Sequence, residues 1–172
     1  FGEDVPEEGD TSYQPIMAVF AMAALMALAA GWAADGAVLT LRVAEWFVAF
    51  SMCILAIQKL RDLESFSTMF LNYDLLARRW VRYGYLYPFG EALAGLLMIA
   101  GALTWLAAPV AVFIGTVGAV SVVKAVYVDG RELKCACVGG DTNVPLGAIS
   151  LTENVMMIVM GFWMVAKSLM PV

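Results

Sequence analysis

Five apolar stretches alternate with short polar segments along the chain. A helix needs about 20 mostly apolar residues to cross the hydrocarbon core of a bilayer, and it satisfies its own backbone hydrogen bonds, which lipid cannot do. The predicted spans cover residues 15–34, 39–57, 88–105, 109–128 and 150–170. We therefore expect an all-α fold, a polytopic membrane helix bundle with about five transmembrane helices and one interfacial amphipathic helix.

Local signals support several of these boundaries. Pro15, Pro88 and Pro109 stand at the predicted starts of three spans, where the first turn of a helix tolerates the missing N–H. Ser150 and Glu153 have the spacing of a capping box before the last span. We expect these residues to mark helix N-termini.

The long connection between the second and third spans has its own periodicity. Apolar side chains recur at steps of three and four residues over 63–80, which is the pattern of an amphipathic helix. We expect this helix to lie at the membrane surface as a structural connector, with Tyr83, Tyr85 and Tyr87 as interfacial aromatic residues before the next span.

Composition supports the membrane assignment. The chain is 62% hydrophobic and 15% charged, with a mean hydropathy of +0.82, whereas a soluble domain is about 45–50% apolar and about 25% charged. Residues 1–14 are acidic and carry Pro and Gly, which predicts a solvated linker that follows an upstream domain or a cleaved leader. Residues 15–172 are expected to form the transmembrane bundle.

Positive charge is distributed unevenly between the two sides of the predicted bundle. With five spans, the N-terminus, the long connection and the loop before the last span share one side. That side holds Lys59, Arg61, Arg78, Arg79, Arg82, Lys124, Arg131 and Lys134, against Arg42 and Lys167 on the other. The positive-inside rule therefore places the loop before the last span in the cytoplasm.

Four ionisable residues fall within the predicted spans, where a charge is costly and suggests function. Each also has a structural explanation. Glu153 can belong to the capping box, and Glu91 can lie in the first turn of its helix, where the helix dipole favours a carboxylate. The ammonium group of Lys124 can extend to the membrane interface. Glu45 can pair with Arg42 or line a water-filled cavity. We favour Glu91 and Lys124 as supporting charges because both lie toward the loop before the last span.

That loop contains two thiols one residue apart, Cys135 and Cys137, followed by two glycines. Arg131 and Lys134 precede them, and nearby cations stabilise a thiolate, the form that attacks disulfides and binds soft metals. A disulfide across one intervening residue closes a small strained ring that is easily reduced, which suits a relay. The spacing itself is equally compatible with a soft-metal ligand pair, and a reducing cytoplasm disfavours a static disulfide.

Other sulfur atoms extend both interpretations. Cys53, in the second span, is a third thiol for the relay or a small core residue. Met156, Met160 and Met164 follow one stripe of the last span, where thioethers can bind Cu(I) or simply fill a helix interface. The chain has no histidine, which argues against zinc and haem as they are usually ligated.

The run from Cys135 to Gly140, together with the spans from the first to the last, resembles the MauE family, methylamine-utilisation membrane proteins grouped with DoxX-like redox-associated proteins. The family's more usual motif is Cys-Gly-Cys-Phe-Gly, from which Ala136 and Val138 depart, and this leaves the subfamily open. The resemblance implies a bacterial inner-membrane protein that makes or transfers disulfides with a thioredoxin- or glutaredoxin-like protein, or with a fused upstream domain.

Three functions are therefore open. The first is a membrane thiol-redox protein, a thiol-disulfide oxidoreductase in which Cys135 and Cys137, with Cys53 as a further candidate, exchange electrons with a dithiol protein; a quinone or another thiol pair would be the final electron partner. The second is a transporter or chaperone for Cu(I) or Hg(II) with Cys135 and Cys137 as ligands. The third is a noncatalytic subunit of a membrane complex. The expected partners are the bilayer and a protein, with no nucleic acid.

Overall fold

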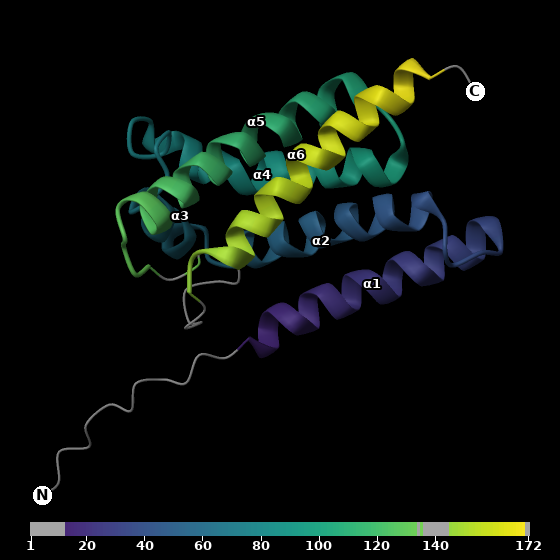
Figure 1. The fold of residues 1–172 in the computed structure, drawn as a ribbon, viewed down its shortest axis with the longest axis horizontal. Helices are drawn as coiled ribbons and strands as arrows, with labels where there is room; N and C mark the ends of the chain where they lie inside the picture. The colour runs from purple at the N-terminus through teal and green to yellow at the C-terminus, as the bar shows by residue number, and fades with distance from the viewer. Residues whose placement is uncertain (1–12, 134, 136–144, 171–172) are drawn as a thin grey trace, which may run out of the picture.

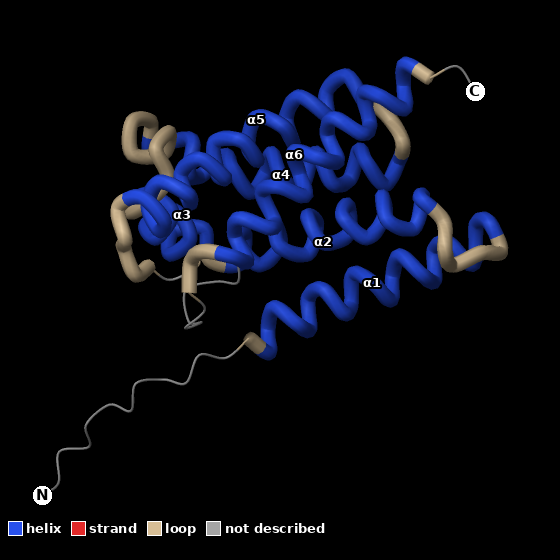
Figure 2. Tube along the Cα trace, in the orientation of Figure 1, coloured by secondary structure: helices blue, strands red, loops and turns tan. Residues whose placement is uncertain are grey.

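The computed structural model describes residues 13–133, 135 and 145–170, and every regular element in these ranges is helical (Figure 2). The elements are α1 (Gln14–Asp35), α2 (Leu41–Arg61), α3 (Leu63–Leu71), α4 (Val81–Ala100), α5 (Thr104–Val122), a π-helical turn η1 (Val123–Val128) that continues α5, and α6 (Ala148–Leu169). The expected all-α bundle is confirmed.

The five long helices lie side by side, with the short α3 across one end (Figure 1). Helix α2 packs between α1 and α4, and α5 packs between α4 and α6. One end of the bundle gathers the starts of α1, α4 and α6 and the ends of α2 and η1 (Figure 1). We call it the cysteine end, because the segment that carries Cys135 joins η1 to α6 there. The other end, the distal end, gathers the α1–α2 and α4–α5 connections and the end of α6. The end of η1 and the start of α6, which flank the two cysteines in the chain, thus lie at the same end as the start of α1 and the connection between α2 and α4.

Four of the described helices are long and apolar enough to cross a membrane, namely α1, α2, α5 with η1, and α6. The sequence predicted about five. Helix α4 spans 20 residues and runs beside α2 and α5, but its length includes Arg82, Glu91 and three tyrosines. Glu91 faces neighbouring helices and is fully buried, so α4 packs within the bundle although it is not one of these four helices.

The prolines mark one predicted helix start correctly and two wrongly. Pro15 lies in the first turn of α1, as expected. Pro88 and Pro109 lie inside α4 and α5, which begin earlier, at Val81 and Thr104. Neighbouring helices can support a helix whose backbone bond is removed by proline, so a proline inside a packed membrane helix is not a boundary.

The predicted amphipathic helix over 63–80 is shorter than expected. Helix α3 ends at Leu71, and turns follow until α4 begins. In the turns, Asp74 accepts hydrogen bonds from the backbone N–H groups of Leu76 (3.0 Å) and Ala77 (2.8 Å). A buried carboxylate that caps a turn in this way stops the helix from continuing.

The aromatic residues of this region pack into the protein rather than along a lipid interface. Phe66 and Phe70 of α3 are buried and stack with ring centroids 5.1 Å apart. Tyr83 and Tyr87 of α4 are also buried, and the Tyr87 ring lies 4.8 Å from that of Phe70. Of the three tyrosines expected at the interface, Tyr85 is exposed. Helix α3 therefore covers the cysteine end of the bundle with an aromatic cluster.

Glycines allow two helix pairs to approach closely. A Cβ added to Gly115 of α5 would lie 2.8 Å from the backbone oxygen of Asn154 in α6. One added to Gly95 of α4 would lie 2.8 Å from Cys53 Sγ and 3.0 Å from the oxygen of Ala49, both in α2. Small residues of this kind let membrane helices pack at backbone contact, and they bring the polar residues of α2, α4 and α6 together.

Candidate functional site

Three charged side chains from three helices meet inside the bundle near the cysteine end. Lys59 of α2 lies 2.6 Å from Glu91 Oε2 of α4 and 2.6 Å from Glu153 Oε1 of α6. Their side chains are 2%, 0% and 5% exposed, respectively. We call Lys59, Glu91 and Glu153 the buried triad; its single ammonium group is shared by two carboxyl groups.

Aromatic and amide groups complete the surroundings of the buried triad. The ammonium of Lys59 lies 5.2 Å from the centre of the Tyr87 ring, a distance at which the ring face attracts a cation. Tyr87 Oη donates a long hydrogen bond to Asn154 Oδ1 (3.4 Å), and Asn154 Nδ2 donates to the backbone oxygen of Ser150 (2.7 Å). The second carboxyl oxygen of Glu91, Oε1, is buried without a hydrogen-bond partner among the described residues.

A small cavity of about 10 Å³ adjoins the buried triad, about the room that one water molecule needs. It is lined by Lys59, Phe66, Phe70, Tyr73, Tyr87, Gly118, Ser150, Glu153 and Asn154. Burial raises the pKa of the Tyr73 phenol well above its usual range, and the nearby charges of Glu153, Asp74 and Glu91 raise it further. Tyr73 therefore stays neutral and remains a hydrogen-bond donor on the α3 side of this cavity.

Sequence reasoning found the two glutamates but misread their roles, and it missed the lysine. Glu91 lies in the middle of α4, not in a first turn, because α4 begins at Val81. Glu153 caps nothing: the N-cap of α6 is Gly147, with no side-chain cap. The charge distribution predicts a loop position for Lys59, but the structure places it in the last turn of α2, where it is buried. One feature of the sequence is compatible with the pairing. Lys59 lies near the end of its span, at a height in the bundle similar to that of Glu91 and Glu153 in two other spans.

Cys135 is completely buried and belongs to the core at the cysteine end. The chain leading to it is held in place at two points. Arg131 Nη1 donates to the backbone oxygen of Asn72 (2.8 Å), and the backbone oxygen of Leu133 accepts from Leu146 N–H (2.7 Å). Cys137 and Lys134 lie outside the described residues, so their predicted roles stay predictions.

The two remaining candidates among the predicted supporting charges lie at the surface. Arg131 is exposed and bonded to the turn at Asn72. Lys124 is 48% exposed and forms an ion pair with Asp129 (2.8 Å). Of the charges predicted to support the cysteines, Glu91 is thus the one that the structure places in the buried triad.

Cys53 is a free thiol, partly buried on α2. Its sulfur fills the space beside Gly95 of α4, which is the packing role that sequence analysis left open. It precedes Lys59 on the same helix, on the distal side of the buried triad.

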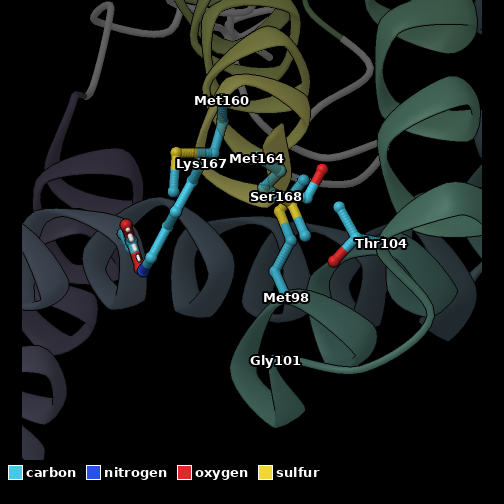
Figure 3. Close-up of a pocket in the computed structure, with 8 residues that line it drawn as sticks. Met98, Gly101, Thr104, Met160, Met164, Lys167 and Ser168 are labelled. Atoms are coloured by element: carbon cyan, nitrogen blue, oxygen red, sulfur yellow. Dashed lines mark hydrogen bonds and ion pairs between the residues drawn. The ribbon is translucent and has the colours of Figure 1, made fainter. Parts of the chain in front are cut away.

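A larger cavity, of about 260 Å³, lies at the distal end (Figure 3). It is lined by Glu45, Met98, Gly101, Thr104, Met160, Met164, Lys167 and Ser168. Glu45 pairs with Lys167 (2.9 Å) and accepts a hydrogen bond from Trp163 Nε1 (2.7 Å). The expected cavity beside Glu45 is present, but the expected partner Arg42 pairs with Asp35 instead (3.1 Å).

Two of the three methionines of the predicted stripe, Met160 and Met164, line this distal cavity together with Met98 of α4 (Figure 3). Cys135 follows η1 and precedes α6 in the chain, and the two helix ends that flank it lie at the opposite end of the bundle. These three thioethers and Cys135 therefore do not form one soft-ligand site.

The sequence profile of the family described as methylamine utilisation protein MauE matches residues 37–167, more than half of the chain. The chain belongs to the MauE family. No curated protein and no solved structure matches it. The matched range of this MauE chain begins after α1 and contains Cys135, Cys137 and all three residues of the buried triad.

Proposed function

We propose that this MauE protein is a membrane thiol-redox protein that exchanges disulfides with a thioredoxin- or glutaredoxin-like partner through Cys135 and Cys137. The observation that carries the proposal is the position of Cys135, buried at the end of a membrane bundle on a segment tied to the bundle through Arg131 and Leu133. A sulfur held in this way is fixed by a rigid scaffold and shielded from solvent, so in the proposal the partner thiolate attacks the other sulfur of the pair and Cys135 is the thiolate that leaves.

The proposed exchange needs no group other than the two proteins. A thiolate of the reduced partner attacks one sulfur of the Cys135–Cys137 disulfide, forming a mixed disulfide and releasing the other cysteine as a thiolate. The partner's second thiol then loses its proton and attacks the mixed disulfide. The partner leaves oxidised, and the pair keeps two electrons and two protons as two thiols. The reverse sequence transfers the two electrons and two protons from the pair to an oxidised partner, which is reduced while the Cys135–Cys137 disulfide forms again.

The proposal places the exchange on the cytoplasmic side of a bacterial inner membrane. The exposed cations of the described cysteine end, among them Arg61, Arg82, Lys124 and Arg131, support this orientation under the positive-inside rule. Lys59 no longer counts toward it, because a buried, paired lysine is not a loop charge.

Cysteine trapping tests the proposal. The membrane protein is mixed with a thioredoxin whose resolving cysteine has been replaced, so that a mixed disulfide cannot be resolved. We expect the mixed disulfide with wild type and with Cys53→Ser, the matched control, and its loss when Cys135 and Cys137 are both replaced by Ser. Full disulfide exchange by the double variant would refute the proposal.

The same variants separate the proposal from its main alternative. Purified wild type that retains stoichiometric Cu(I), and a Cys135→Ser variant that loses it, would assign the pair to soft-metal binding instead. Alkylation of the two cysteines from each side of sealed vesicles, with and without prior reduction, reports orientation. Labelling from the periplasmic side alone would overturn the cytoplasmic placement.

A further inference from the structure

We propose that the buried triad is a proton-binding site, in which Glu91 and Glu153 together hold one exchangeable proton beside the charged Lys59. This inference is independent of the thiol chemistry. It concerns a charge cluster that the disulfide exchange does not use.

The first argument is the charge balance. With all three groups ionised, the buried triad carries one positive and two negative charges, a net charge of −1. An uncompensated charge inside a membrane bundle is costly, and even a paired one must recover a desolvation penalty. One added proton makes the cluster neutral, as an ammonium, a carboxylate and a carboxylic acid. Both glutamates lie 2.6 Å from Lys59, so the geometry allows either to be the ionised partner.

The second argument is the unpartnered oxygen of Glu91. Its Oε1 atom is buried and accepts no hydrogen bond among the described residues. A carboxylate oxygen left in that state loses its hydration without compensation. Protonation of Glu91 removes the charge from this oxygen and leaves Glu153 as the ionised partner of Lys59.

The third argument is the character of the groups around the cluster. Among the described residues, Lys59 is the cation that pairs with Glu91 and with Glu153. The other titratable groups near the buried triad are acidic or neutral: Cys53 on α2, Tyr73 and Asp74 after α3, and Tyr83 and Tyr87 on α4. Helix α5 has no ionisable residue. No second cation in the described part of the chain therefore replaces the missing positive charge.

The small cavity beside Glu153 gives the proton a place to enter or leave. It has the size of one water molecule and is bordered by polar groups of Tyr73, Ser150 and Asn154. A water needs two to four such partners to be held in a buried position. The cavity lies toward α3, whose Phe66 and Phe70 also line it, so exchange with solvent is expected from the cysteine end.

Infrared difference spectroscopy of the purified protein tests the site, because a protonated carboxyl group has a C=O stretch separate from that of a carboxylate. We expect wild type to show a buried carboxylic acid that shifts in D₂O, which reports exchange. Its intensity should change between about pH 5 and about pH 9, where buried carboxyl groups can titrate. Glu91→Gln and Glu153→Gln should each abolish this band, because Lys59 and the remaining carboxylate are then neutral without a proton.

Two variants serve as controls. Glu45→Gln makes the same chemical change at the ion pair of the distal end. Asp74→Asn removes a further carboxyl group that is buried among the described residues of the cysteine end. We expect both to keep the band assigned to the buried triad. A band that survives in both Gln variants of the triad, or that never exchanges with D₂O, would refute the proposal.

Stability against pH gives a second readout. A glutamate in the unfolded chain releases its proton at about pH 4.3, whereas the proposed site still holds a proton at higher pH. The folded state then binds more protons than the unfolded state, so stability falls as pH rises. We expect the Gln variants to lack that part of the pH dependence. An identical pH profile in wild type and both Gln variants would contradict the proposal, whatever the outcome of the thiol experiments.

Discussion

Replacing Lys59 by methionine removes the one cation that the buried triad shares. Methionine keeps the length and apolar stem of lysine but leaves two carboxyl groups facing each other at the positions that now lie 2.6 Å from the ammonium. Removing one partner of a buried ion pair typically costs about 3–5 kcal/mol. Since about 1.4 kcal/mol is a tenfold change in an equilibrium constant, the ratio of folded to unfolded protein should fall by a factor of roughly 100 or more.

Lys167→Met is the matched control. It makes the same substitution in the ion pair with Glu45 at the distal end, where the lysine side chain is 53% exposed. Exposed ion pairs contribute about 0–1 kcal/mol, so this variant should be nearly as stable as wild type. The measurement is equilibrium unfolding in mixed micelles, followed by circular dichroism.

Two further arms identify the cause of the Lys59→Met effect. Lowering the pH should reduce the penalty, because protonation of the remaining carboxylates removes their repulsion. Combining Lys59→Met with Glu91→Gln and Glu153→Gln should restore most of the lost stability, since no charge is then left buried. Equal losses in Lys59→Met and Lys167→Met, within about 1 kcal/mol, would refute the reasoning.

Two other predictions concern packing and a buried turn. Gly115→Ala should destabilise the protein by about 1–3 kcal/mol, because the added Cβ would lie 2.8 Å from the backbone oxygen of Asn154 in α6. Gly90→Ala is the control and should be tolerated, because its Cβ would lie 3.7 Å from Val110. Equal unfolding midpoints for the two variants would contradict the prediction. Burial raises the pKa of Asp74 in the folded protein. The protonated side chain therefore contributes fully to stability below the pKa that Asp74 has in the unfolded chain, and this contribution is lost as pH rises through the folded-state pKa. Asp74→Asn should therefore be more stable than wild type at neutral pH and lose that advantage in acid, as thermal unfolding at several pH values would show.

The apolar pattern of the chain determined the class of fold. Long apolar runs must become helices in lipid because no other local structure satisfies the backbone there, and four such helices are present in the described chain. The pattern could not fix the boundaries of α4. The first turns of α4 carry Tyr83 and Tyr87, and tyrosines next to an apolar run predict a membrane interface. In the folded protein both tyrosines are buried against α3 and belong to the helix.

For the candidate site, too, the sequence indicates some residues, whereas the pairing between them is visible only in the structure. The sequence alone pointed to Cys135 and Cys137, since two close thiols stand out in a chain without histidine, and it singled out Glu91 and Glu153 as charges within spans. It could not pair either glutamate with Lys59, which is 32 residues from Glu91 and 94 from Glu153. Which residues of separate helices face each other depends on helix rotation and depth, and these are set by close packing at positions such as Gly95 and Gly115 rather than by local periodicity. Only the tertiary structure therefore revealed that a lysine at the end of one span is the buried partner of two carboxyl groups.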